Sequence, residues 1–342
     1  MRVRELTGLR PWIFPLCLLL GSLFFGAVAA YKAPNLFSGP VIVAMLAVSV
    51  SRATPLVYGS LSGIFCERSG VTQIAIEGMM LTAAFFAFAV QVATHNIFIA
   101  LGGAMLAGAL MGAFHAVLSI TFQVNQIISG TVVNILSIGL TGYLNRQLFL
   151  FDQAIDVTVF PQLPVPVLAD LPWLGRILFS HQPLTYVALL LPLMAHVWLF
   201  HTTWGLRTRA VGEHPLAADT AGINVYSIRY LNVIVGGALA GLGGAYFTLE
   251  SIPTFQPLMT NGRGFIALAA MIFGKWTPLG AWGGALLFGV AEALPVTLQI
   301  QGVTVNYFLV GLLPYVLTII VLAGAVGRAS PPAAIGLPYD RR

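Results

Sequence analysis

The chain has 342 residues, of which 58% are hydrophobic and 8% charged, and its formal net charge is +5. A soluble domain of this size carries about a quarter charged residues, because water must wet its surface. The composition therefore excludes an ordinary soluble fold and indicates a surface that faces lipid. The positive charges lie singly between apolar runs, so the sequence does not predict nucleic acid binding.

Ten apolar segments follow one another along the chain, and most have the roughly 20 residues that a membrane-spanning helix needs. We therefore predict an all-α polytopic bundle of about ten transmembrane helices, at 12–30, 40–63, 73–94, 97–120, 124–144, 184–201, 225–249, 264–274, 277–300 and 303–325. The first segment contains Ala27-Val28-Ala29 near its end, which also fits the cleavage site of a signal peptide, but the length of the segment favours a retained helix. The eighth is too short to cross alone, which predicts a broken or re-entrant helix enclosed by protein.

The distribution of Lys and Arg predicts the orientation. With the N-terminus inside, eleven of these residues fall in inner connections, so both termini are expected to be cytoplasmic. Four fall in outer connections: Lys32, Arg146, Arg176 and Arg263. Two connections are long: residues 146–183 fall outside, and residues 202–224 fall inside. The outer one is rich in proline and is expected to be a stiff external loop rather than a domain. Residues 1–342 are therefore expected to form a single transmembrane domain.

The inner connection contains a pattern typical of a short helix. Pro215 suits the first helical position, where its missing N–H is no loss. Glu213 would lie at the positive end of the helix dipole, and Gly222 would end the helix. Alanine predominates between them. A short helix with small side chains can dock into a groove of another protein, although an ordinary surface turn explains the pattern as well.

Four blocks of sequence resemble one family of membrane proteins. Gly205-Leu-Arg-Thr-Arg-Ala-Val-Gly-Glu-His-Pro-Leu-Ala-Ala-Asp-Thr-Ala-Gly-Ile resembles the coupling segment of ABC importer permeases of the branched-chain amino acid, ribose and nucleoside type, with His214 where asparagine is common. Residues 67–81 resemble a second signature of this family, with Gln73 and Ala75 in place of the usual asparagine and glycine. Residues 264–278 and the tail Pro338-Tyr-Asp-Arg look most like the nucleoside and simple-sugar branch.

The resemblance implies a type II importer permease fold that works in a pair, either as a homodimer or with a second, unlike permease. It implies that an ATPase subunit contacts the coupling residues Gly212, Glu213, His214, Pro215, Ala217 and Ala218. The chain has no G-x-x-x-x-G-K-[ST] sequence, so we expect no enzyme activity and no bound cofactor, with ATP and Mg on the partner ATPase. It also implies an extracytoplasmic solute-binding protein that docks near residues 146–183, and a location in the bacterial cytoplasmic (inner) membrane.

Amide and hydroxyl side chains recur on one face of the fifth segment. At 100° per residue they fall within one arc, and a lipid-facing stripe of this kind would be costly. The stripe should therefore face the bundle interior, either as contacts between helices or as a substrate path. Such groups suit a neutral, hydroxyl-rich solute such as a nucleoside or a simple sugar. The substrate-pathway candidates are Gln126, Ser129, Asn134, Ser137 and Thr141.

Three charged residues, Arg52, Glu77 and Glu292, fall within apolar segments. Charges inside the membrane are functional candidates by default. Glu77 belongs to the signature that the resemblance places near the cytoplasmic end, which favours a structural hydrogen-bonding role, and Arg52 is expected to pair with one of the two acids. An ion-gradient-driven secondary transporter is the main alternative, because the acids would serve as its ion or proton sites. The sequence shows neither the repeated pore motif of a channel nor a catalytic constellation.

Overall fold

The computed structural model describes residues 38–149, 157–302, 311–320 and 330–340, and almost all of its regular structure is helical. The first half contains α2 (Gly39–Arg68), α3 (Ile76–Thr94), α4 (Ile97–Ala116), the π-helix η1 (Val117–Thr121) and α5 (Gln126–Phe149). Two short strands, β1 (Leu163–Pro164) and β2 (Ser180–His181), pair antiparallel around α6 (Leu174–Leu178). The second half contains α7 (Pro183–His201), α8 (Thr203–Glu213), α9 (Pro215–Thr220), α10 (Val225–Tyr246), the π-helix η2 (Phe247–Ser251), α11 (Arg263–Phe273), α12 (Pro278–Ile300) and α14 (Leu313–Ile320).

The predicted spanning segments correspond to helices wherever the chain is described. Seven helices in this part are long and apolar enough to cross a membrane: α2, α3, α4 with η1, α5, α7, α10 with η2, and α12. The eighth apolar segment forms the 11-residue helix α11, as its length predicted. The first segment, 12–30, lies outside the described residues, and the tenth is described only over 311–320. The all-α, multi-pass character is therefore confirmed, and the number of ten helices stays a prediction.

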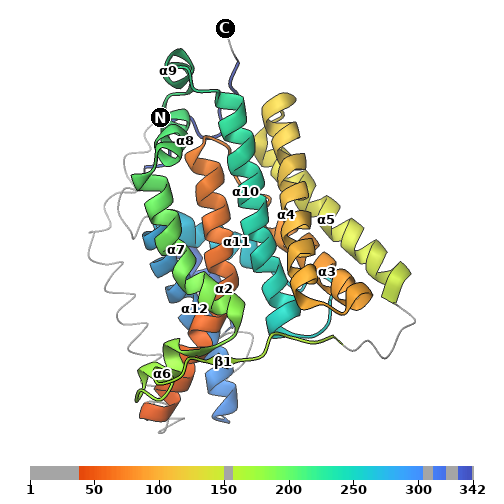
Figure 1. Cartoon of the computed structure of the whole chain (residues 1–342), viewed down its shortest axis with the longest axis vertical. Helices are drawn as coiled ribbons and strands as arrows, with labels where there is room; N and C mark the ends of the chain where they lie inside the picture. The colour runs from red at the N-terminus through yellow and green to blue at the C-terminus, as the bar shows by residue number, and fades with distance from the viewer. Residues whose placement is uncertain (1–37, 150–156, 303–310, 321–329, 341–342) are drawn as a thin grey trace, which may run out of the picture.

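The helices α2 and α10 form the centre of the bundle. They pack on each other, while α12 and α11 lie against α2, and α4 and α3 lie against α10. Figure 1 shows α5 on the outside of α3 and α4, leaning away from the rest. It also shows α8, α9 and the C-terminal tail at one end of the bundle, the α9 end, and α6 with β1 at the opposite end, the α6 end.

Glycines allow the closest helix contact in the core. The pairs Gly108 with Gly112 and Gly237 with Gly241 face each other across α4 and α10. A Cβ atom at Gly112 would lie 2.8 Å from the carbonyl oxygen of Val233, and one at Gly241 would lie 2.7 Å from that of Ala104. No side chain fits at these distances, so the backbones can approach as they do between packed membrane helices.

The helix α11 covers only part of the membrane thickness. Its 11 residues rise about 16 Å, roughly half of a hydrocarbon core of about 30 Å. Its C-terminal end is fixed at the α9 end, because Trp276 Nε1 donates to Glu67 Oε2 at 2.5 Å and Arg68 Nε donates to the Trp276 carbonyl at 2.9 Å. The start of α11 therefore lies deep in the bundle, and residues 252–262 reach it as non-helical chain.

Candidate functional site

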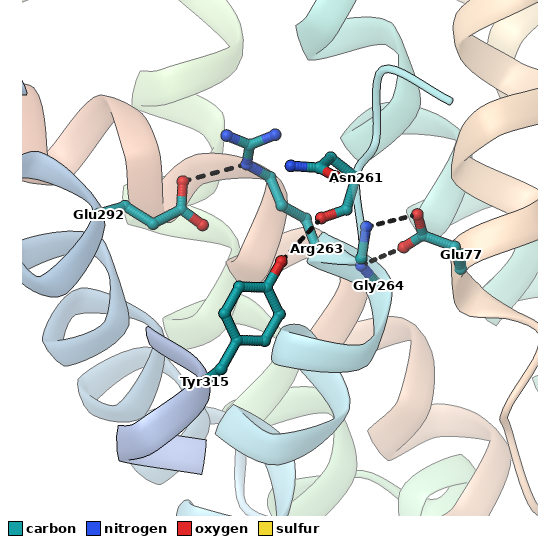
Figure 2. Close-up of polar contacts among 7 residues, drawn as sticks. Glu77, Asn261, Arg263, Gly264, Glu292 and Tyr315 are labelled. Carbon is teal, nitrogen blue, oxygen red and sulfur yellow. Dashed lines mark hydrogen bonds and ion pairs between the residues drawn. The ribbon is translucent and has the colours of Figure 1, made fainter. Parts of the chain in front are cut away.

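The carboxylate of Glu77 holds the buried start of α11. Its Oε1 atom accepts hydrogen bonds from Thr260 Oγ1 at 2.6 Å and from the Gly262 N–H at 2.8 Å. Its Oε2 atom accepts from the Gly264 N–H at 2.7 Å (Figure 2). The first N–H groups of a helix lack partners and carry partial positive charge, so a carboxylate satisfies them and stabilises the helix start. These are the contacts of the structural role expected for Glu77, although the residue lies deeper than the sequence suggested.

An ion pair lies on the other side of the same helix start. The Nε atom of Arg263, the first residue of α11, is 3.0 Å from Oε2 of Glu292 on α12, and their side chains are 19% and 9% exposed. The sequence placed Arg263 in an outer connection and expected Arg52 to pair with Glu77 or Glu292. The structure corrects both points: Arg263 lies inside the bundle and is the partner of Glu292. Because α11 begins inside the bundle, its first residue is carried there with it.

A partly open cavity of about 140 Å³ lies beside this ion pair. Arg52 on α2 and Tyr315 on α14 line it together with Asn261, Arg263 and Glu292, and Tyr315 Oη lies 3.5 Å from the Asn261 carbonyl (Figure 2). The remaining lining is Ile266, Pro295, Val296, Gly311 and Pro314. Charged groups at this depth are normally found facing a protein interior or a water-filled path. The amide, phenol, guanidinium and carboxylate groups together offer both donors and acceptors to a polar solute.

The polar stripe of α5 faces inward, as predicted, and contacts α3 and the turn before it. Asn134 accepts from the Gly78 N–H at 2.8 Å and donates to the Ile74 carbonyl at 3.1 Å. Gln126 accepts from the Thr72 N–H at 2.6 Å, and Ser129 Oγ lies 2.9 Å from His115 Nδ1. Within α5 itself, the hydroxyls of Ser137 and Thr141 donate to the carbonyls of Val133 and Ser137. The five candidates do not line the cavity around Glu292. Their contacts are those of helix packing, and a role in the substrate path remains a prediction.

The predicted short helix of the inner connection is present as α9. Pro215 occupies its first turn, and Gly222, in the left-handed conformation at φ +82°, follows its end. A second helix, α8, precedes it and was not expected, because its sequence has no apolar stripe to mark it. Gly212 packs against the end of α2, where a Cβ atom would collide with the Arg68 carbonyl, and Ala218 is 4% exposed.

A groove of about 600 Å³ runs between this segment and the C-terminal tail. Four of the six coupling candidates line one wall: Glu213, His214, Pro215 and Ala217. Residues 333, 334 and 337–340 of the tail line the other. The two walls are joined, because the Ala333 N–H donates to Glu213 Oε2 at 3.1 Å and the Ala334 N–H donates to the Gly212 carbonyl at 2.9 Å.

In the described part of the chain, seven helices long and apolar enough to cross a membrane surround a half-length helix that starts beside a buried ion pair, an arrangement typical of a multi-pass membrane protein. Residues 44–322 match the family described as "Branched-chain amino acid transport system / permease component". The chain belongs to this family. It is the membrane-spanning permease subunit of an ATP-driven importer in the cytoplasmic membrane, so the predicted class is confirmed and the secondary transporter is not favoured.

Several named proteins are similar over most of their length. The guanosine ABC transporter permease protein NupQ of Bacillus subtilis is 40% identical over 299 residues, and the nucleoside ABC transporter permease protein NupC of Lactococcus lactis is 39% identical over 300 residues. Each match covers 84% of this chain and 93% of the relative. The putative glucose ABC transporter permease protein TsgC13 of Haloferax volcanii is 35% identical over 324 residues, which cover 87% of this chain and 97% of the relative. The guanosine ABC transporter permease protein NupP of Bacillus subtilis is 26% identical over 254 residues, which cover 70% of this chain and 70% of NupP. No solved structure matches the chain.

Proposed function

We propose that this permease carries nucleosides into the cell. The observation that carries the proposal is the near 40% identity to two nucleoside permease proteins, which extends over 93% of each of them. Permease proteins with a sugar in their name are also similar, since TsgC13 is 35% identical. A simple sugar is therefore the second candidate, and it shares with nucleosides the hydroxyl groups of a sugar ring.

The cavity around Arg263 and Glu292 is a section of the solute path in this proposal. Glu292 offers an acceptor for sugar hydroxyls, while Arg52 and Arg263 offer donors for carbonyl oxygens of a base. The volume of about 140 Å³ is below the 300–1,000 Å³ or so of pockets that enclose a small ligand. The cavity must therefore widen for each passage, and ATP-driven closure of the partner ATPases would supply the change of state.

The subunit arrangement follows from the relatives and from the expected orientation. NupQ and NupP are two guanosine permease proteins of one organism, and this chain resembles the first more than the second. We therefore favour a heterodimer with a NupP-like permease over a homodimer. The α9 end, with residues 202–224, would face the cytoplasm and the ATPase subunits. The α6 end, with residues 157–182, would face outward and receive a solute-binding protein.

Uptake of labelled guanosine tests the substrate class. Cells of the native host that lack this chain should lose most high-affinity guanosine uptake and regain it when the chain is restored. Unlabelled glucose in excess serves as the competitor. Restored uptake that guanosine inhibits and glucose does not would support a nucleoside permease. Uptake of labelled glucose that depends on this chain, with guanosine uptake unchanged by its loss, would contradict the proposal.

A further inference from the structure

The cavity beside the start of α11 holds more positive than negative charge. Arg52 and Arg263 line it against a single carboxylate, that of Glu292. Two further carboxylates of the bundle interior are engaged elsewhere, because Glu77 caps the start of α11 and Glu250 caps the start of α7. One of the two guanidinium groups therefore has no counter-charge among the described residues.

Arg52 is that guanidinium group. It lies near the middle of α2 and is half-buried, and it makes no hydrogen bond or ion pair to any residue that the structure describes. An unpaired cation inside a membrane protein is costly, so its presence indicates a function. A guanidinium group is planar and presents its N–H donors as a fixed fork. Arg52 therefore offers two adjacent donors to a solute in the cavity.

Glu292 supplies an acceptor in the same cavity. Its Oε2 atom is bound by Arg263 Nε at 3.0 Å, while its Oε1 atom has no hydrogen bond within the described part of the chain (Figure 2). Arg263 is itself held, because its guanidinium lies 5.5 Å from the ring centre of Phe247. The ion pair thus positions the Glu292 carboxylate. This carboxylate also disfavours an anionic solute such as a nucleotide, because it would repel a phosphate group.

Two donors and one acceptor match the edge of a 6-oxopurine base. Guanine and hypoxanthine present two acceptors, N7 and O6, followed by the donor N1–H. Adenine presents the acceptor N7, the amino donor on C6 and then the acceptor N1. An arginine fork on N7 and O6 is the commonest specific contact that proteins make with guanine. Adenine in the same position would set a donor against a donor and an acceptor against an acceptor, and unmatched polar groups of this kind are costly.

We infer that this cavity selects 6-oxopurine nucleosides over adenosine, with Arg52 as the specificity-determining residue. The Arg52 fork donates to N7 and O6, Glu292 Oε1 accepts from N1–H, and Arg263 holds Glu292 in place. The inference rests on the proposed function, because it takes the cavity as part of a nucleoside path.

The preference between two nucleosides tests the role of Arg52. Uptake of labelled guanosine and of labelled adenosine is measured in native host cells that carry either the unmodified chain or Arg52→Gln. The solute-binding protein is the same in both strains, so a change in preference arises in the permease. A glutamine side chain matches the N7 and amino groups of adenine, and the ratio of adenosine to guanosine uptake should rise about tenfold or more. A ratio does not depend on the amount of folded permease.

Arg146→Gln is the matched control. Arg146 is also half-buried, but it lies near the end of α5 and does not line the cavity. Its loss removes the same chemical group, and the ratio of adenosine to guanosine uptake should equal that of the unmodified chain.

Thermal unfolding with added nucleoside tests the same contacts without a variant. The importer complex is purified in detergent without its solute-binding protein, so only the permease and ATPase subunits are present. Inosine should raise its unfolding temperature more than adenosine at the same concentration. 1-Methylinosine, which lacks the N1 proton, should stabilise less than inosine.

The outcomes separate the inference from the proposed function. An unchanged uptake ratio in Arg52→Gln, or equal stabilisation by inosine and adenosine, would overturn the inference while nucleoside uptake by the unmodified chain upholds the proposed function. Absence of any nucleoside uptake that depends on the unmodified chain would instead count against the proposed function itself.

Discussion

Arg263 and Glu292 form an ion pair, with 3.0 Å between Nε and Oε2, in the interior of a bundle whose outer surface faces lipid. Arg263 is the first residue of α11, where the helix dipole disfavours a positive charge. The negative charge of Glu292 offsets the unfavourable position of the Arg263 charge, while Glu77 accepts hydrogen bonds from the N–H groups on the other side of the helix start. Three charged side chains thus meet where the non-helical chain becomes a helix.

Removing one partner of this ion pair should destabilise the permease. Glu292→Gln leaves the Arg263 guanidinium without its counter-charge, and we expect a loss of about 2 kcal/mol, less than for a fully buried pair because both groups have some exposure. Thermal unfolding in detergent measures the change. The double variant Arg263→Gln with Glu292→Gln should be more stable than either single variant. Additive losses in the double variant would show that the two residues do not interact.

Glu77→Ala should be more damaging than loss of any one of its partners. The substitution leaves the Gly262 and Gly264 N–H groups and the Thr260 hydroxyl without an acceptor, at a cost of about 2–4 kcal/mol. Thr260→Val removes only one of the three bonds and should cost about 1 kcal/mol. The yield of folded protein and its thermal unfolding should follow the order unmodified, Thr260→Val, Glu77→Ala. Equal stability of the two variants would argue against this capping role.

A variant of Asn134 distinguishes the two interpretations of the α5 stripe, which are contacts between helices and a substrate path. Asn134→Ala removes the partner of the Gly78 N–H and of the Ile74 carbonyl, so we expect about 1–3 kcal/mol of destabilisation. If the stripe only packs helices, the variant that remains folded should take up guanosine with an unchanged KM. A KM raised severalfold at unchanged stability would instead place Asn134 in the solute path.

Charge reversal in the coupling segment should uncouple hydrolysis from transport. Glu213→Arg removes the acceptor of the Ala333 N–H and replaces one of the two carboxylates of the groove with a positive charge, so the ATPase should hydrolyse ATP without driving uptake. Glu213→Gln keeps an acceptor oxygen and should retain most of the uptake. ATPase activity and guanosine uptake are measured on the same vesicles. A Glu213→Arg permease that assembles and transports normally would refute the coupling role of this residue.

Sequence patterns predicted the features that depend only on residues close together in the chain. The α5 stripe follows from the rotation per residue, and α9 follows from Pro215 and Gly222, so both were identified. The length of 264–274 indicated an incomplete helix. Each of these predictions needs only neighbours within a turn or two of chain.

Contacts between segments far apart in the chain could not be predicted from such local patterns. Arg263 was assigned to an outer connection because the charge rule uses only the order of apolar runs, and nothing in that order shows that residues 252–262 enter the bundle. Its partner Glu292 lies on another helix, and Arg52 was an equally good candidate in sequence. The tail was missed as a wall of the groove because its contacts are made mainly by backbone groups, which every residue carries.

The half-length of α11 has a consequence for how the protein is made. A segment with 11 helical residues and a non-helical approach cannot enter the hydrocarbon region alone, because lipid offers no partners for its free N–H and carbonyl groups. It needs Glu77 of α3 and the surfaces of α2 and α12 in place first. Of these, α12 is synthesised after α11, so we expect α11 to reach its final position only once α12 has inserted. Packing of α11 against α2, α3 and α12 would then be a late step in the biogenesis of this permease.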